Sequence, residues 1–288
     1  MSNQIVLGLA TRQNLLSLQG INQNIQTSQN HLATGLKVSS AVDDAVKFFQ
    51  SQSLVTRAND LSQRKDAIDQ GVSSLTTATQ AIQSVVSTLQ QLQGILNSAK
   101  TQSASQRVSA ATQFNTLSKQ LNNLVNDASY QGLNLVNSTA SVLSLQFSIS
   151  STSTLKVHGQ NLLASKLVTA AVAGAASKLA TNIVGTLFSK VSNKTSKFDA
   201  AFNVLQSAVF TAQADAQSLG ANVTFLQTRL SFTSQYIATL QGGSDKLIVA
   251  DVNEESTNLV TLQTRQNLAI QSLSIATQSE QAVLRLFR

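Results

Sequence analysis

Two long runs of residues keep a spacing that alternates between four and three, and they constrain the fold more than any other feature. Heptad spacing of this kind places one stripe along a helix and is typical of coiled-coil-like rods. The first run comprises Leu61, Lys65, Ile68, Val72, Leu75, Thr79, Ile82, Val86, Leu89, Gln93 and Leu96. The second comprises Phe198, Phe202, Leu205, Val209, Ala212, Ala216, Leu219, Val223, Leu226, Leu230, Thr233, Ile237 and Leu240. Each run predicts a helix roughly 55–65 Å long.

The two rods are expected to pack against each other as an antiparallel bundle, because each has an apolar stripe that must be buried. The chain has no proline, the residue that breaks helix interiors, which favours long uninterrupted helices. The predicted rod core consists of Leu61, Ile68, Val72, Leu75, Ile82, Val86, Leu89, Phe202, Leu205, Val209, Leu219, Val223, Leu226, Leu230 and Ile237.

The segment between the rods changes its periodicity. A shorter helix fits the spacing of apolar residues over 111–128, and alternating apolar residues then predict a small β-hairpin near 142–158. Residues 161–197 read as a short outer insert rich in Ala, Ser and Lys. The fold class is therefore mostly α: a long antiparallel coiled-coil-like helical bundle with a small β-hairpin and paired terminal helices.

Both ends of the chain are again apolar with helical spacing, in a near-palindrome of terminal helix, rod, middle, rod and terminal helix. We expect terminal helices in 1–40 and 248–288 and a rod domain in 41–160 and 198–247. Gly35 is expected to end the first helix, and Gly242 and Gly243 to end the second rod. Ser40 with Asp43, and Asp251 with Glu254, resemble capping boxes at helix starts. The terminal helices have little core of their own, so their apolar faces must meet each other or neighbouring subunits.

Composition argues against catalysis and cofactors. There is no Cys, and His31 and His158 lie far apart, so neither a metal site nor a catalytic constellation is expected. Asp43 with Asp44, and Glu254 with Glu255, are best explained as charge at helix N-termini. The basic middle, with six Lys and no acidic residue over 128–198, lacks the Arg and stacking aromatics of a nucleic-acid site. It is most simply a solvated surface.

No membrane insertion and no cleaved signal peptide are expected. Lys166 and Lys178 interrupt the most apolar segment, whose longest uncharged stretch is about eleven residues where a span needs about twenty. The first eighteen residues lack the basic start, apolar run and cleavage site of a signal peptide.

Several motifs, in order, resemble bacterial flagellin, here in a short form with a small outer region. His31-Leu-Ala-Thr-Gly-Leu-Lys-Val-Ser-Ser-Ala-Val-Asp-Asp-Ala45 is similar to the family's N-terminal signature, and Asp127-Ala-Ser-Tyr-Gln-Gly-Leu-Asn-Leu135 to its segment before the hairpin. Asn253-Glu-Glu-Ser-Thr-Asn-Leu, Leu262-Gln-Thr-Arg-Gln266 and Gln281-Ala-Val-Leu-Arg-Leu-Phe287 are similar to its C-terminal signature. The family often has Lys where Val42 stands and Gly where Lys47 stands.

The resemblance implies an exported structural subunit that polymerises into an extracellular flagellar filament for motility, and not an enzyme. Its implied partners are other copies of itself, an export chaperone and the type III export apparatus, and the filament cap and hook-junction proteins. The terminal helices would form the inner tube through Leu18, Ile21, Ile25, Leu32, Leu273, Val283, Leu284, Leu286 and Phe287. The alternatives are a flagellin-like hook-filament junction protein, a coiled-coil translocator or pore former, and a helical enzyme.

Overall fold

The computed structural model describes residues 9–148, 152–170 and 195–286. It divides into two compact units, one made of Met1–Ala58 with Ala238–Arg288 and the other of Asn59–Ile237. Long helices paired antiparallel, two small antiparallel strand pairs and a pair of terminal helices confirm the predicted fold class. The two longest helices, α2 (Ala45–Thr101) and α6 (Thr195–Ile248), each contribute residues to both units.

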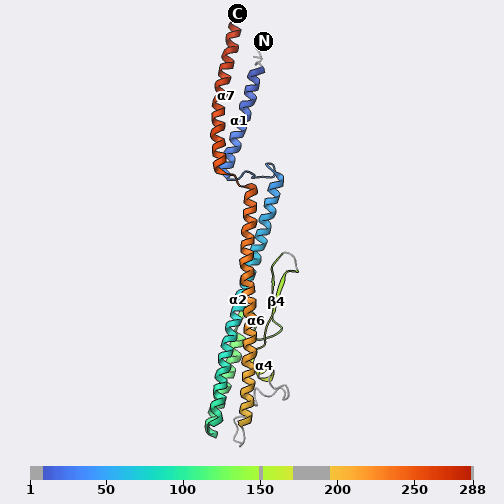
Figure 1. Cartoon of the computed structure of the whole chain (residues 1–288), viewed down its shortest axis with the longest axis vertical. Coiled ribbons are helices and arrows are strands. Elements are labelled where there is room, and N and C mark those ends of the chain that lie inside the picture. Colours follow the sequence, from blue (N-terminus) through green and yellow to red (C-terminus); the bar gives the residue numbers. More distant parts are fainter. Residues whose placement is uncertain (1–8, 149–151, 171–194, 287–288) are drawn as a thin grey trace. The chain divides into compact units, whose positions relative to one another are not determined.

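The unit that holds both chain ends contains helix α1 (Leu9–Thr34) and helix α7 (Val252–Leu286), which run side by side (Figure 1). As predicted, α1 ends before Gly35, whose φ of 70° suits glycine and whose N–H donates to the His31 carbonyl at 2.8 Å. The chain then pairs Leu36 with Val249 in an antiparallel bridge. The Gly35 carbonyl accepts from the Ala250 N–H at 2.9 Å, so the end of α1 is tied to the segment just before α7.

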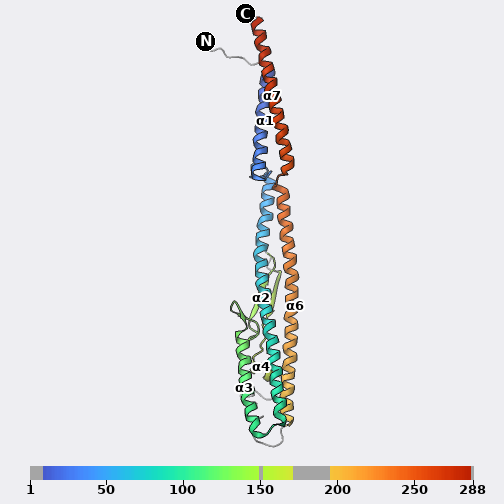
Figure 2. The same cartoon turned by 90° about the vertical axis from the view of Figure 1, so that its left-hand side faces the viewer.

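The other unit is built on α2 and α6, which run antiparallel, with α3 (Ala104–Asp127) beside α2 (Figure 2). Two contacts fix the antiparallel register: the Gln93 side-chain amide donates to Gln206 Oε1 at 2.9 Å, and Lys100 forms an ion pair with Asp199. The apolar stripes of the helices meet in one continuous core, in which Ile68, Leu75, Ile82, Leu121 and Leu226 are fully enclosed.

The structure places the predicted rod-core residues at two depths. Those that are buried are Leu61, Ile68, Leu75, Ile82, Leu89, Leu205, Val209, Leu219 and Leu226. Those that are half-buried are Val72, Val86, Phe202, Val223, Leu230 and Ile237. This difference in burial is expected for an apolar stripe on a helix. Residues in the middle of the stripe face the bundle axis and are buried, whereas residues at its edges are only half-buried.

The hairpin predicted near 142–158 is present. Strand β3 (Val142–Gln146) pairs antiparallel with β4 (Thr154–His158), with Leu143 opposite Val157 and Leu145 opposite Leu155. Leu143, Leu145 and Val157 are buried, as alternation along a strand with one covered face requires. A second and smaller pair, β1 (Ser129–Tyr130) with β2 (Leu133–Asn134), was not predicted.

The β1–β2 pair is organised by its turn and by one buried amide. Gln131 and Gly132 both have positive φ, 49° and 81°, which is the geometry of a tight two-residue hairpin. The Asn134 side chain donates to the Val125 carbonyl at 2.7 Å and accepts from the Val136 N–H at 2.8 Å. This amide joins the end of α3 to the strands that follow it.

The prediction that Gly242 and Gly243 end the second rod is wrong, because α6 continues through them to Ile248. Tertiary packing overrides their low helix propensity. The Ser244 hydroxyl is buried and lies 2.9 Å from that of Ser51 on α2, and the position of Gly243 faces the Leu54 side chain. The helix ends only where the Val249 N–H makes its last bond, to the Asp245 carbonyl.

The predicted capping pair at the start of α2 is shifted. The carboxylate of Asp44, not the Ser40 hydroxyl, caps the helix by accepting from the Lys47 N–H at 3.0 Å. Asp43 instead closes a turn before the helix, where its Oδ2 accepts from the N–H and hydroxyl groups of Ser39 and Ser40. Four hydrogen bonds to one carboxylate, those from Ser39 being the strongest, lower the pKa of Asp43.

The beginning of the insert expected at 161–197 packs into the core of the rod unit. Leu162 and Leu167 are buried, the latter on α4 (Ala164–Ala170). The Ala164 N–H donates to the Asn122 side chain on α3 at 2.9 Å, and the Leu162 N–H to the Val136 carbonyl. Residues 171–194 lie outside the described residues, so an outer position for the rest of the insert stays a prediction.

Gly159 is expected to tolerate no side chain. A methyl group added there would overlap the Ser138 carbonyl oxygen and lie 3.2 Å from that of Leu135, so backbone would have to move. We expect Gly159→Ala to destabilise the rod unit by about 1–3 kcal/mol, as overpacking does. In contrast, Gly94→Ala in α2 meets open space and should stabilise by about 0.5–1 kcal/mol. Thermal melts followed by circular dichroism compare the two; equal shifts would contradict the predicted close packing at Gly159.

Candidate functional site

The candidate site is the antiparallel pair of α1 and α7. Its register follows from two side-chain contacts: Ser28 meets Glu255, and the Gln266 amide donates to Asn22 Oδ1 at 2.6 Å. Ile25 and Thr11 on α1 are buried in this unit. The remaining apolar positions that share the stripe are half-buried, namely Leu18, Ile21, Leu32, Leu259, Leu262, Ala269, Leu273 and Ala276. Heptad-like stripes on both helices explain the pairing.

Five of the nine residues predicted to pack in an inner tube lie on these paired helices and are buried or half-buried, namely Leu18, Ile21, Ile25, Leu32 and Leu273. The other four are Val283, Leu284, Leu286 and Phe287. The backbone of α7 is described to Leu286, but these four side chains lie outside the described part of the chain. Packing of all nine inside a tube stays a prediction.

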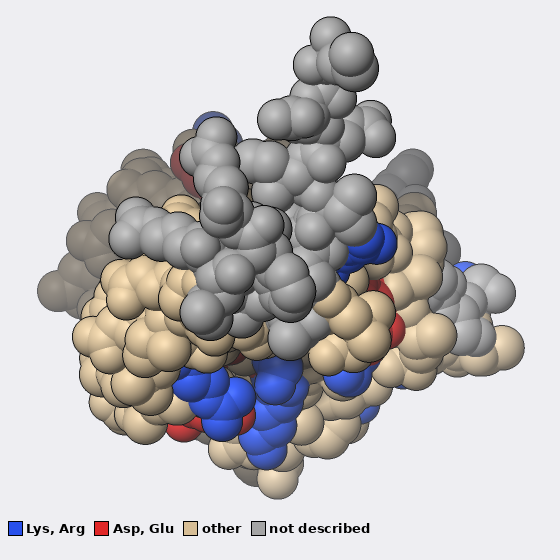
Figure 3. Space-filling view, turned by 90° about the horizontal axis from the view of Figure 1, so that it is seen from above, with Lys and Arg blue, Asp and Glu red and all other residues tan. Residues whose placement is uncertain are grey.

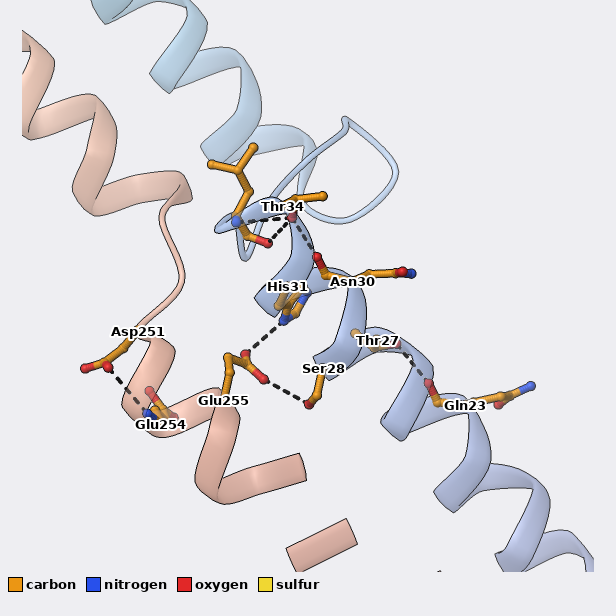
Figure 4. Close-up of polar contacts among 10 residues, drawn as sticks. Gln23, Thr27, Ser28, Asn30, His31, Thr34, Asp251, Glu254 and Glu255 are labelled. Carbon is orange, nitrogen blue, oxygen red and sulfur yellow. Dashed lines mark hydrogen bonds and ion pairs between the residues drawn. The ribbon is translucent and has the colours of Figure 1, made fainter. Parts of the chain in front are cut away.

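A buried polar contact fastens the two helices near their junction with the rods (Figure 4). Glu255 is only 8% exposed, and both of its carboxylate oxygens are satisfied from α1. Oε1 lies 2.8 Å from His31 Nδ1, and Oε2 accepts from the Ser28 hydroxyl at 2.9 Å. Because an ionised carboxylate can only accept, His31 Nδ1 must carry the hydrogen. The hydrogen bond from His31, helped by that from Ser28, holds the pKa of Glu255 below its usual range, although burial opposes the shift.

Sequence reasoning missed this contact. Glu255 was interpreted only as charge at a helix N-terminus, and His31 was given no role. Asp251 does begin α7 as predicted, since its Oδ1 accepts from the Asn253 N–H at 2.9 Å. The available signal was that Ser28 and His31 lie three residues apart on the predicted apolar side of α1, where polar side chains need partners. The partner's position depends on the interhelical register, which spacing alone does not give.

Both helices also carry apolar side chains on the faces that the pair leaves open. On α1 these include Leu9 and Leu16, which are 76% and 66% exposed. On α7 they include Val260, Leu268 and Ile275, which are 60–68% exposed. Each helix thus has an apolar side used within the pair and further apolar residues without cover. These uncovered apolar side chains are candidates for contact with another molecule.

Charged side chains are few where Figure 3 draws described residues. In that view the acidic and basic side chains form small adjacent groups, and the other described residues are uncharged. The described residues contain no group of three or more His, Asp or Glu that could hold a metal ion. Within those same ranges, no helix is both long enough and apolar enough to cross a membrane.

Pairing of α1 with α7 is expected to weaken in acid. A carboxylate whose folded pKa is lowered adds stability above its unfolded pKa, about 4.3 for Glu, and loses it as the pH falls through the folded pKa. The protection of the α1 and α7 amides against hydrogen exchange, relative to the intrinsic rate at each pH, should therefore fall below about pH 4. Glu255→Gln should show less of this acid dependence, whereas the exposed neighbour change Glu254→Gln should keep it. The same profile in all three proteins would contradict the assignment.

The sequence matches known flagellins along nearly its whole length. Residues 4–141 match the family described as the bacterial flagellin N-terminal helical region. The chain is 27% identical to a flagellin of Brucella melitensis over 95% of both chains. It is also 27% identical to flagellin FljO of Caulobacter vibrioides, over 95% of this chain and 96% of that one. A shorter stretch of 93 residues is 43% identical to flagellin A of Rhizobium meliloti, covering 31% of this chain and 24% of that one.

The fold is shared with a solved flagellar protein. A flagellar hook-associated protein from Vibrio parahaemolyticus superimposes with a TM-score of 0.60 at 13% identity, covering 72% of this chain and 100% of that one. At that identity the likeness concerns the fold alone. The sequence matches point to a structural protein of the bacterial flagellum. Along nearly its whole length the chain is similar to bacterial flagellins, the structural subunits of the flagellar filament.

Proposed function

We propose that this protein is a subunit of a flagellar filament and polymerises through the apolar side chains that α1 and α7 leave uncovered when they pair. The observation that carries the proposal is the exposure of Leu9 and Leu16 on one helix and of Val260, Leu268 and Ile275 on the other. Covering such side chains with a neighbouring copy removes apolar area from water, which is the main favourable term in protein association. The contact between Glu255 and His31 would hold the two helices in the register that presents these faces.

In this proposal the paired terminal helices form an inner tube, and the rods of residues 41–160 and 198–247 surround it. The remainder of 161–197 faces outward. The four C-terminal residues Val283, Leu284, Leu286 and Phe287 would complete the tube packing. The role is structural and not enzymatic: the sequence has no Cys and only two His, far apart.

The proposed route to the filament is export without a cleaved leader. The chain would be held by a cytoplasmic chaperone, pass through the type III export apparatus and assemble outside the cell beneath the filament cap. The likeness to flagellins in sequence supports this route. Contacts with hook-junction proteins would occur where the filament begins.

A flagellin-like hook-filament junction protein is the second candidate, because the Vibrio hook-associated structure shares the fold. That likeness speaks to the fold, whereas flagellins of Brucella melitensis and Caulobacter vibrioides match in sequence over about 95% of both chains. Self-polymerisation of the purified protein separates the candidates. A junction protein would stay monomeric or form short complexes under conditions in which a flagellin forms long filaments.

The combined change Leu268→Ser with Ile275→Ser is expected to impair polymerisation without unpairing the helices. Both side chains are at least 60% exposed, and burying one such side chain is worth about 1.5–3 kcal/mol. The concentration of free subunit in equilibrium with filaments should rise at least about tenfold. The matched control, Thr257→Ser with Thr264→Ser, changes two exposed positions of the same helix without removing large apolar groups. Sedimentation measures the free subunit; equal values for both double variants would sink the proposal.

A further inference from the structure

Helix α6 carries a second stripe, beside its core stripe, made of aromatic residues around one arginine. Phe225, Arg229, Phe232 and Tyr236 follow one another with spacings of four, three and four. Phe225 and Phe232 are 50% and 52% exposed, although both are large apolar side chains. Phe147, next to strand β3, anchors the stripe, with its ring edge-on to Phe225 at 5.9 Å between centroids. Phe232 stacks on Tyr236 at the same distance. We call these five residues the α6 aromatic cluster.

The guanidinium of Arg229 is held within this cluster by rings and not by acids. Its central carbon lies 5.2 Å from the ring centroids of both Phe147 and Phe232. Its Nε is enclosed and has no hydrogen-bond partner among the described residues. Within those residues its guanidinium also forms no ion pair. The rings fix the side chain and shield it from water, while the donors at its outer edge remain available.

A guanidinium with fixed geometry and free donors is suited to a carboxylate, which it can bind with two parallel hydrogen bonds. The rod unit itself carries acids that lack a counter-charge. Asp66 and Asp69 are exposed one turn apart on α2 and have no ion pair in the described structure. Asp199, by contrast, is already paired with Lys100, and Asp215 is half-buried. Asp60 on α2 is half-buried, and Asp127 at the end of α3 is exposed but stands alone. Asp66 and Asp69 are therefore the adjacent pair of exposed carboxylates on α2 that could meet the unpaired Arg229.

We propose that the α6 aromatic cluster is an interface between copies of this chain, and that Arg229 receives Asp66 and Asp69 from α2 of a second copy. The inference rests on the proposed self-polymerisation, and it adds a contact between rods to the contact between terminal helices. The partner is identified by charge complementarity and by the need to cover Phe225 and Phe232. In a filament the α6 aromatic cluster of each copy would contact one neighbour, and the α2 acids of the same copy would contact another. Because the two surfaces in contact differ, the contact is heterologous.

Charge reversal tests the contact. Arg229→Glu, and separately Asp66→Arg with Asp69→Arg, should each raise the free-subunit concentration at least about tenfold, the loss expected when a charge-assisted hydrogen bond is removed. An equimolar mixture of the two variants should recover polymerisation. When the two variants alternate along the polymer, the residue at position 229 of each copy meets residues of opposite charge at positions 66 and 69 of its neighbour. Arg229→Gln should act in the same direction and more mildly. Lys119→Glu, an exposed charge reversal on α3, is the matched control and should have little effect.

The outcomes separate this inference from the proposed function. If the unaltered protein forms no filaments, the proposed function fails. If it does form them and Arg229→Glu polymerises equally well, or the mixture fails to recover, or Lys119→Glu has the same effect, only the inference is overturned. Circular dichroism of the monomers establishes that the variants are folded. Because the chain has no Cys, oxidation of mixed Arg229→Cys and Asp69→Cys chains gives a second readout. Disulfide-linked dimers are expected in filaments, and their absence there would also overturn the inference.

Discussion

Leu226→Asp is expected to unfold the rod unit at neutral pH. Leu226 has no exposed surface and lies in the continuous core that joins α2, α3 and α6. A carboxylate there would be isolated in apolar surroundings, which costs several kcal/mol even after relaxation. The whole stability of a typical domain is only about 5–15 kcal/mol. Circular dichroism should show a large loss of helix or a melting temperature lowered by tens of degrees.

The neighbouring change Gln227→Asp supplies the control for register. Gln227 is exposed, so the same carboxylate one residue further along α6 remains in water. Its effect on the free energy of unfolding should be within about 0.5 kcal/mol. Because the two variants have nearly the same composition, the difference between their melting temperatures shows which side of α6 faces the core. Similar melting temperatures for both would mean that the assigned face of α6 is wrong.

The rod helices could be predicted because the apolar residues that pack them together recur at a fixed spacing in the sequence. Burial of one stripe along a helix repeats about every seven residues, so residues such as Ile68, Leu75, Ile82 and Leu89 reveal both the helix and its covered face. The hairpin was predictable for the same reason, since Leu143, Leu145 and Val157 alternate with polar residues.

Features that depend on a partner from a distant part of the sequence could not be predicted. Gly242 and Gly243 are strong local signals for a helix end, yet the contact of Ser244 with Ser51 holds α6 intact beside α2. The burial of Glu255 depends likewise on the register of α7 against α1, which places its carboxylate between Ser28 and His31. Local propensity is a weak prior where long-range packing is available.

The candidate site was predicted as a pair of apolar stripes, and this much the periodicity supports. The spacing alone does not specify which apolar residues of each helix face the partner helix and which remain exposed. That division needed the structure, which buries Ile25 but leaves Leu16 and Leu268 exposed. The motifs that resemble flagellin indicated the filament role independently of this geometry, because they are tied to a family and not to a single contact.

Ile25→Asp is expected to abolish polymerisation while leaving the rods folded. Ile25 is buried in α1, one turn before the Ser28 that contacts Glu255, so a carboxylate there would be placed in the seam between α1 and α7. The change loses about 1.5–3 kcal/mol of apolar burial and adds the cost of a desolvated charge. A total above about 2.8 kcal/mol corresponds to more than a hundredfold rise in the free-subunit concentration.

The rods should not respond, because Ile25 belongs to the unit of Met1–Ala58 with Ala238–Arg288, whereas the rod core lies in Asn59–Ile237. Gln26→Asp, an exposed change at the next position, should polymerise almost normally. Sedimentation gives the free-subunit concentration, and hydrogen exchange of α7 amides reports whether the helices still pair. Normal filaments from Ile25→Asp would show that assembly does not need the α1–α7 seam. A lowered melting temperature of the rods would show that the two units do not unfold independently. Lost assembly with an unchanged melt would place the assembly function in the terminal pair, because the rod core would then be intact in a subunit that cannot polymerise.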